Sequence, residues 1–208
     1  MLIGISGKKQ SGKSTIAQYL IEQGCVGILC FADKIKEIVR DLFFEPEEDY
    51  IDLDSEAGKQ TVLRCGWTPR ELLQIVGTDL FRSLYRDVWI NAFKNQMYLV
   101  EHYPVVVVPD VRFENEVEFI HSMGGKVIRL TRQPFPDQHE SETALDWLVN
   151  ETEAWQAGYN TEAVCDPIKL HFDAIIDNAD MGISEQCQTA ESLISGWISA
   201  QKANDCAQ

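Results

Sequence analysis

Residues 7–14, Gly-Lys-Lys-Gln-Ser-Gly-Lys-Ser, match the phosphate-binding pattern G-x-x-x-x-G-K-[ST] at every fixed position. The apolar run 1–6 before them has the length of a buried strand, and 14–22 after them has apolar residues at helical spacing. This strand–loop–helix context separates a working motif from a chance match. The competing interpretation is a turn of Gly, Ser and Lys that opens an ordinary helix. The context favours a loop that binds a nucleotide.

The chemistry of such a loop follows from its geometry. Glycines let the backbone fold tightly, so that successive N–H groups point at phosphate oxygens. A helix that begins at Gly12 directs the positive end of its dipole at the same anion. Lys13 would reach the outer phosphates of a nucleoside triphosphate, and the Ser14 hydroxyl would help to hold Mg²⁺. We therefore expect ATP to bind at Gly7, Lys8, Gln10, Ser11, Gly12, Lys13, Ser14 and Thr15.

Composition limits the partners of the chain. Its 208 residues suit one domain, or one core with an inserted lid. The formal net charge of −15 argues against a nucleic-acid backbone as the main partner, although a pocket can still gather cations for a small phosphorylated ligand. The longest apolar run, near 105–108, is too short to span a membrane. The first strand begins at Met1, so we expect no targeting peptide and a cytoplasmic location, which is the host cytoplasm if a phage encodes the chain.

The six cysteines form no C-x-x-C pair and no ligand-like group with the four histidines. Without an export signal, reduced thiols are the expected state, and the spacing indicates no zinc site.

Predicted strands alternate with predicted helices along the chain. The strands are expected at 1–6, 25–31, 104–108, 126–130 and 172–177, and the helices at 14–22, 32–43, 69–93, 113–123, 142–149 and 183–200. Thr68 and Glu71 would cap the helix at 69–93, which has a potential break near Gly77. This order predicts an α/β fold of three layers, α/β/α, with a mainly parallel five-stranded sheet. Ligands in such sheets bind beyond the carboxyl ends of the strands.

We expect a single domain, 1–208, with three functional parts. The core would comprise about 1–43, 100–131 and 171–208, a helical region at about 32–99 would bind a monophosphate, and a lid would span about 132–170. The acidic run 45–56 is typical of a solvated loop.

A polar cluster follows the valine-rich strand at 104–108. Asp110 stands at the end of that strand, where a carboxylate suits Mg²⁺ or its water shell, and Arg112 would project into the same crevice. An N-cap aspartate followed by a surface arginine would give the same pattern. Hydrolytic motors usually keep an acidic residue directly after the aspartate, and Val111 stands there, which weakens that class.

Four cations accompany the motif: Lys9, Arg70, Arg112 and Arg132. A monophosphate acceptor is already an anionic nucleophile at neutral pH, because its second pKa is about 6. Its reaction therefore needs cations that align two phosphates and screen their repulsion more than it needs a base. Each arginine alone is typical of a surface residue, but their shared placement after strands and in the mid-chain helix favours a clamp, with Arg132 where a lid would begin.

The segment 68–79 and the following Trp89 complete the pattern. An interrupted helix that carries Arg70, Gly77 and Thr78 could grip a phosphate and read a base, on which Trp89 could stack. A core helix, with Trp89 inside, is the alternative that the apolar spacing supports.

Together, GISGKKQSGKST, FADKIKE, TPRELLQIVGTDLFR, VVVVPDVRFENEVEFI, GGKVIRLTR and DQHESE resemble the bacteriophage-type deoxynucleoside monophosphate kinases. These are P-loop kinases, distantly related to the phosphomevalonate kinases of animals. The resemblance runs from residue 2 to about 145, with a weaker match at 172–178. It implies transfer of the ATP γ-phosphate to a deoxynucleoside monophosphate (dNMP), which supplies nucleotides for phage DNA synthesis.

The resemblance also implies roles for single residues. Lys13, Arg112 and Arg132 would be catalytic, and Ser14 and Asp110 would hold Mg²⁺. The monophosphate would contact Lys9, Lys36, Arg70, Gly77, Thr78, Trp89 and Arg132. Asp137 and Glu142 would belong to the lid over ATP. The family is usually dimeric, so a homodimer is expected, whereas the acidic run 45–56 matches no family pattern.

Two alternatives stay open. One is a P-loop kinase for another phosphorylated acceptor, such as a phosphomevalonate-like substrate, against which Gly77, Thr78 and Trp89 argue because they suit a flat base. The other is a nucleotide-dependent switch without phosphate transfer, and the lack of an Asn-Lys-x-Asp sequence weakens its GTPase form.

Overall fold

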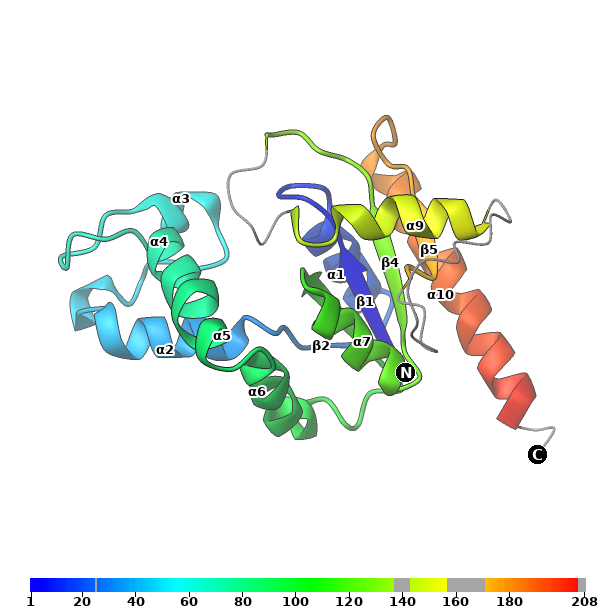
Figure 1. Ribbon diagram of the computed structural model, residues 1–208, viewed down its shortest axis with the longest axis horizontal. Coiled ribbons are helices and arrows are strands. Elements are labelled where there is room, and N and C mark those ends of the chain that lie inside the picture. The colour runs from blue at the N-terminus through cyan, green and yellow to red at the C-terminus, as the bar shows by residue number, and fades with distance from the viewer. Residues whose placement is uncertain (25, 137–142, 157–170, 206–208) are drawn as a thin grey trace. The chain divides into compact units, whose positions relative to one another are not determined.

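The computed structural model describes residues 1–24, 26–136, 143–156 and 171–205 (Figure 1). The chain divides into two compact units: Met1–Leu29 with Leu99–Gln208 forms the first, and Cys30–Tyr98 forms the second. The second unit begins and ends within a few residues of the region expected to bind the monophosphate. Each unit is described by itself.

The first unit contains a five-stranded sheet in the order β2-β3-β1-β4-β5, in which all pairs are parallel. The strands are β1 (Leu2–Ser6), β2 (Val26–Ile28), β3 (Val105–Val111), β4 (Lys126–Leu130) and β5 (Ala174–Ile176). The predicted parallel sheet is confirmed. Both β1 and β3 are interior strands and are apolar on both faces, as strands covered by helices on each side must be.

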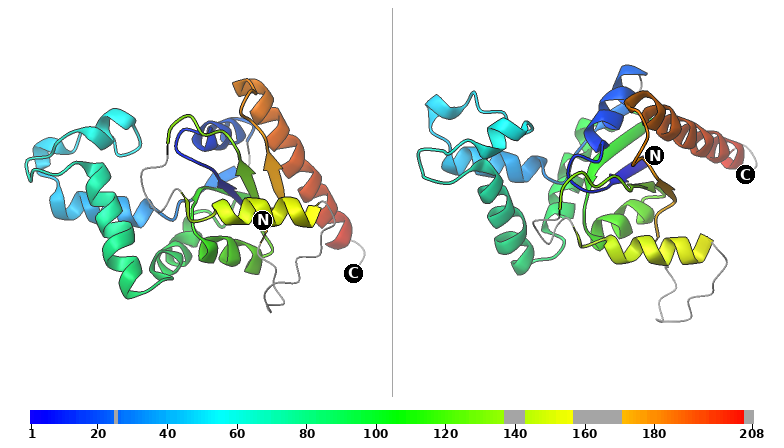
Figure 2. Two further views of the ribbon diagram at one scale, coloured as in Figure 1. Left: turned by 45° about the horizontal axis from the view of Figure 1, so that its top comes forward. Right: turned by 90° about the horizontal axis from the view of Figure 1, so that it is seen from above.

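Helices cover both faces of this sheet, which confirms the three layers (Figure 2). Helices α1 (Lys13–Glu22) and α10 (Ile183–Asp205) lie on one face, and α7 (Glu114–Ser122) and α9 (Asp146–Gln156) lie on the other. The core between the sheet and these two helices contains side chains from α1, from α10 and from the strands, including Ile5, Ile16, Leu130 and Ala190. This buried layer fixes the two ends of the loop that joins β1 to α1.

The second unit is helical in the part of the chain that the structure describes. Its elements are α2 (Asp33–Phe43), η1 (Pro46–Glu48), α3 (Glu56–Gln60), α4 (Pro69–Gln74), η2 (Ile75–Leu80), α5 (Phe81–Leu84) and α6 (Val88–Gln96), and η3 (Met97–Leu99) follows. A separate core of Val39, Ile51, Leu63, Leu72, Val76 and Trp89 holds these helices together.

The predicted start and break of the helix at 69–93 are both found. The Thr68 hydroxyl accepts from the N–H of Glu71, whose carboxylate accepts from the N–H of Thr68. Around Gly77 the helix widens into η2, a π-helix, and the chain leaves helical geometry between α5 and α6. Short π-helical stretches inside α-helices are frequent at functional sites.

Most of the acidic run 45–56 is exposed, in line with a solvated loop, but Glu48, Ile51 and Leu53 are buried. Ile51 and Leu53 are each 4% exposed and pack inside the second unit. The buried Glu48 carboxylate accepts hydrogen bonds from the backbone N–H groups of Glu45 and Arg64, which lower its pKa. Alternating apolar residues therefore anchor a segment whose charge pattern alone suggested full hydration.

Among the described residues, no helix is long and apolar enough to cross a membrane. Cys30, Cys65 and Cys187 are free thiols, and burial raises the pKa of Cys187.

Asp173, just before β5, ties β4 and α7 to that strand. Its carboxylate accepts from the Lys126 ammonium at 2.7 Å, from the N–H of Val127 at 2.8 Å and lies 3.0 Å from His121 Nε2. Donor atoms of Asp173, His121 and His171 all lie within 4.8 Å of one another, as in a metal site. However, the Lys126 ammonium already neutralises the carboxylate, so we interpret the cluster as an ion-pair network.

The pKa of Asp173 gives a prediction for acid stability. Burial alone would raise it, but the hydrogen bonds from His121, Lys126 and Val127 outweigh burial and lower it from 3.8 to about 2. A depressed carboxyl pKa stabilises the fold above pH 4 and loses that contribution as the pH falls toward 2. Asp173→Asn should therefore cost about 2 kcal/mol of unfolding free energy at pH 7, and the difference from wild type should shrink between about pH 4 and 2.

Denaturant titrations across that pH range measure the effect, and the exposed Asp180→Asn serves as the matched control. A constant difference between wild type and Asp173→Asn at all pH values would contradict the assignment.

Candidate active site

The phosphate-binding motif forms the loop between the end of β1 and the start of α1, at the carboxyl edge of the sheet. Gly12 has φ 107° and stands directly before α1, which begins at Lys13, between the two expected starts at Gly12 and Ser14. A Cβ at Gly12 would lie 2.8 Å from Gln186 Oε1, and one at Gly7 would lie 2.5 Å from Ser11 Oγ. The side chains of Ser11 and Gln186 approach the backbone so closely that both positions favour glycine.

Lys13 is folded into its own loop. Its ammonium donates to the carbonyl oxygens of Gly7 at 2.7 Å and Lys8 at 2.6 Å, and only 9% of the residue is exposed. These two hydrogen bonds fix the position of the Lys13 ammonium inside the loop.

The first turn of α1 adds hydrogen-bond donors. The N–H of Ile16 is bonded to Gly12 O, and in any helix the N–H groups before that point lack an intrahelical partner. Ser14 and Thr15 are exposed at this turn, as is Gln10 in the loop. A helix N-terminus with these groups is suited to an anion.

Two buried side chains that we did not predict brace the loop. Asn178, which is fully buried after β5, donates to Ser11 O at 2.7 Å and to Gln186 Oε1 at 2.8 Å. Its own oxygen accepts from the N–H of Arg132 at 2.9 Å. One amide therefore joins the loop, the end of β4 and helix α10. Its position directly after a strand was the signal that could have identified it.

A second buried network lies beside the loop. The Arg129 guanidinium donates to Ser6 Oγ at 3.0 Å and to Asp146 Oδ1 at 2.9 Å, and the other oxygen of Asp146 accepts from Lys8. Both Lys8 and Arg129 are largely buried, while the Asp146 side chain is 42% exposed. The Lys8 side chain thus attaches the start of α9 to the loop, a role that the motif alone did not indicate.

Asp110 lies near the carboxyl end of β3, and Arg112 directly follows that strand. The register pairs Ser6 with Val111, which places Asp110 on β3 beside the end of β1. Both Asp110 and Arg112 are half-buried. The N–H of Arg112 donates to Glu116 at 2.7 Å, which fixes the turn into α7.

The remaining cations of the first unit lie near the start of the expected lid. Arg132 donates from its guanidinium to the carbonyl of Met181, so its side chain is attached to the turn before α10. The Lys9 ammonium lies 5.8 Å from the centre of the Phe135 ring. Asp137 and Glu142 lie outside the described residues.

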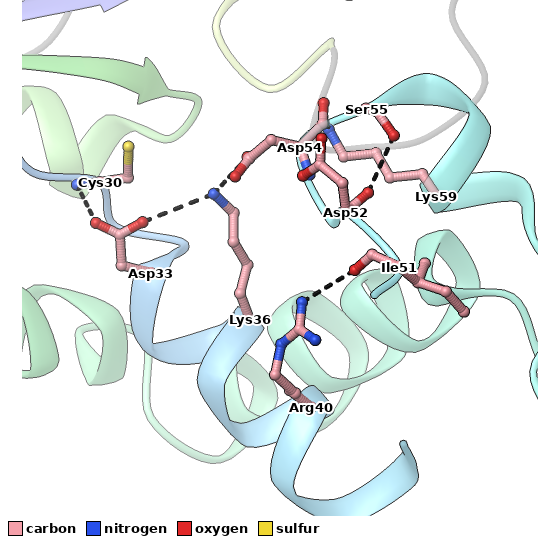
Figure 3. Close-up of polar contacts among 9 residues, drawn as sticks. All are labelled: Cys30, Asp33, Lys36, Arg40, Ile51, Asp52, Asp54, Ser55 and Lys59. Carbon is pink, nitrogen blue, oxygen red and sulfur yellow. Dashed lines mark hydrogen bonds and ion pairs between the residues drawn. The ribbon is translucent and has the colours of Figure 1, made fainter. Parts of the chain in front are cut away.

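The other predicted substrate residues belong to the second unit. Lys36 of α2 lies 2.7 Å from Asp54 and 3.6 Å from Asp33, and Arg70 of α4 lies 2.8 Å from Glu56 (Figure 3 shows the Lys36 contacts). Burial by itself would lower the pKa of Lys36, but the hydrogen bond and charge of Asp54 raise it overall. The raised pKa keeps Lys36 charged at neutral pH, and both Lys36 and Arg70 are paired with carboxylates of the acidic run.

Gly77 of η2 and Trp89 of α6 contact each other in the core of the second unit. The Trp89 indole N–H donates to Gly77 O at 2.6 Å, and the ring is 2% exposed and packs edge-on against Phe81. Thr78 is half-buried on the same turn. Stacking on a base requires an open ring face, so the burial of Trp89 favours the core role that its spacing also allowed.

Comparisons with known proteins identify a family. The sequence model described as deoxynucleotide monophosphate kinase matches residues 43–153. A protein of Acanthamoeba polyphaga mimivirus assigned to the same activity is 34% identical over 160 residues, which is 70% of this chain and 82% of that protein. The deoxynucleotide monophosphate kinase of Enterobacteria phage T4 is 30% identical over 125 residues, 57% of this chain and 48% of that protein.

Among solved structures, a Thermus thermophilus protein aligns with a TM-score of 0.48 and 17% identity over 94% of this chain and 96% of its own. A shikimate kinase of Bacteroides thetaiotaomicron aligns with a TM-score of 0.43 and 15% identity over 94% and 98%. The fold assignment rests on the strand order and the parallel pairing, and the family rests on the sequence matches. By those matches, this chain belongs to the deoxynucleotide monophosphate kinase family.

Proposed function

We propose that the protein transfers the γ-phosphate of ATP to a deoxynucleoside monophosphate and releases ADP and the diphosphate. Family membership is the observation that carries this proposal. The geometry of the loop supports it, because Lys13 and the first turn of α1 offer positive charge and N–H groups to one polyphosphate.

The first unit supplies the donor side. Lys13 would stabilise the charge that develops on the transferred phosphoryl group, and backbone N–H groups from Gly7 to Thr15 would orient the triphosphate. The hydroxyl of Ser14 and the carboxylate of Asp110 are oxygen donors of the kind that Mg²⁺ takes, so they fit that ion. When bound, Mg²⁺ would neutralise the β- and γ-phosphate oxygens. Arg112 and Arg132 stay predictions as clamp residues.

The second unit supplies the acceptor side. The monophosphate is an anionic nucleophile, so its binding residues need to be cations rather than bases. Lys36 and Arg70 meet this need, and Thr78 on the π-helical turn would contact the nucleoside. We leave Trp89 out of the acceptor contacts because its ring is buried.

The relatives described above give no support to a phosphomevalonate-like acceptor or to a switch that does not transfer phosphate. The homodimer stays a prediction.

The central prediction concerns turnover. The protein with ATP, Mg²⁺ and a panel of deoxynucleoside monophosphates should form ADP only when an acceptor is present. Lys13→Ala should lower kcat by at least about 100-fold, because the lost charge acts on the transition state. Coupled ADP assays measure this, and unfolding curves should show an intact fold.

Lys202→Ala on the exposed end of α10 is the matched control and should keep wild-type rates. Acceptor-independent ADP formation, or near-normal turnover in Lys13→Ala, would contradict the mechanism.

Asn178→Asp tests the brace behind the loop. The carboxylate keeps the acceptor for the Arg132 N–H but replaces the donor that faces Ser11 O and Gln186 Oε1. Loss of this buried bond should raise KM for ATP by about 10-fold or more and leave KM for the monophosphate nearly unchanged. The matched control is Asn95→Asp, which makes the same change at an exposed position of α6. Equal KM values for ATP would show that the loop holds its shape without Asn178.

Lys36→Met and Arg70→Met test the acceptor side. Each removes one charged contact, so KM for the monophosphate should rise by about 10- to 100-fold while KM for ATP stays the same. Lys34→Met removes an exposed lysine of the same helix, which pairs only at the surface with Glu37 at 2.6 Å, and should change neither constant. A rise in KM for ATP instead would move these residues to the donor side.

A further inference from the structure

Three cations from three helices converge on one short acidic segment, Asp54-Ser55-Glu56. Lys36 of α2 donates to the Asp54 carboxylate at 2.7 Å, and Arg70 of α4 donates to Glu56 at 2.8 Å. The ammonium of Lys59 in α3 donates to the backbone carbonyl of Asp54 at 3.2 Å. Figure 3 shows Lys36 and Lys59 approaching Asp54 from opposite sides.

The carboxylates are the outer layer of this cluster. The side chains of Asp54 and Glu56 are 71% and 39% exposed, whereas those of Lys36 and Arg70 are 21% and 26% exposed. Ion pairs with such exposed partners contribute little to stability, so these carboxylates can leave at low cost. The cations beneath are held by their own helices and would stay.

The positive charges also affect one another. Burial lowers the pKa of Lys59, and the charges of Lys36 and Arg70 lower it further, while Asp54 and Glu56 oppose them. The three cations therefore lie close enough to repel, and the carboxylates of Asp54 and Glu56 compensate, with Asp33 beside Lys36 at 3.6 Å. Two carboxylates carry the same charge as the dianion of a phosphate monoester above pH 6.

We propose that Lys59 completes the acceptor-phosphate site with Lys36 and Arg70, and that the Asp54 and Glu56 carboxylates occupy this site in place of the phosphate until the acceptor displaces them. The inference rests on the proposed function and extends it. The dianion of a phosphate monoester supplies two negative charges in place of the two carboxylates that leave. A nucleoside without phosphate supplies none. The site would thus select for the monophosphate by charge.

Replacing Lys59 tests the third cation. Lys59→Met should raise KM for the monophosphate by about 10-fold with kcat and KM for ATP unchanged, and Lys59→Arg should restore it. In wild type, Lys59 faces Asp54, Glu56, Lys36 and Arg70, and its lowered pKa should make KM for the monophosphate rise at alkaline pH. In Lys59→Arg this rise should move to higher pH, because arginine keeps its charge.

Removing the carboxylates tests the displacement. The double variant Asp54→Asn with Glu56→Gln should lower KM for the monophosphate by about 3- to 10-fold and strengthen competitive inhibition by inorganic phosphate. Glu47→Gln, whose carboxylate pairs with Arg64 at 3.4 Å, removes one charge of the same acidic run outside the cluster and is the control. An unchanged or raised KM in a double variant with normal unfolding curves would overturn the displacement.

Different results would contradict the proposed function and the role of Lys59. If wild type transfers phosphate to no deoxynucleoside monophosphate, the proposed function is wrong. If wild type is active but Lys59→Met and Lys59→Arg keep its KM and its pH profile, the function stands and Lys59 is no part of the site.

Discussion

This structure depends on one constraint. The chain has a net charge of −15, yet it must keep positive charge available to bind phosphate. Cations gathered in one place repel each other and attract any nearby carboxylate. The protein satisfies this constraint in two ways. The loop holds the Lys13 ammonium with the carbonyl oxygens of Gly7 and Lys8, which fix its position. The second unit holds Lys36 and Arg70 with the carboxylates of Asp54 and Glu56, which in our proposal leave when an anion competes.

The two solutions differ in burial, and burial decides which contacts can exchange. Asn178 and Gln186 behind the loop are 0% and 1% exposed, and loss of a buried hydrogen bond leaves an unsatisfied polar group. The loop geometry is therefore fixed before a ligand arrives, which suits catalysis by preorganised donors. Asp54 is 71% exposed, and water replaces its contact easily. In the function that we propose, the fixed contacts serve the chemical step and the exchangeable ones serve acceptor binding.

The sequence predicted the sheet, its layers and the loop because each depends on local pattern. Apolar runs followed by glycines give strands and tight turns, and Thr68 with Glu71 marks a helix start wherever it occurs. The braces could not be predicted in this way, since Asn178 meets Ser11 across 167 residues and only the strand order brings them together. The anchors of the acidic run were missed for a related reason: its charges hid the alternation of Ile51 and Leu53, which are buried. The ion pairs of Lys36 and Arg70 with that run could also be identified only from the three-dimensional structure.

Trp89 is a packing residue that supports the backbone turn on which Thr78 lies. A wider helical turn at η2 moves backbone groups away from ideal helical positions, and a buried carbonyl there needs a donor. The Trp89 indole N–H supplies it at Gly77 O, while Gly77 itself lies close to Ile35, 3.1 Å from where a Cβ would stand. Absence of a side chain at Gly77 and the buried donor at Trp89 thus set the path of the backbone that presents Thr78. The resemblance assigned Trp89 to the base and its apolar spacing assigned it to the core; in the structure it is buried and bonded to Gly77 O.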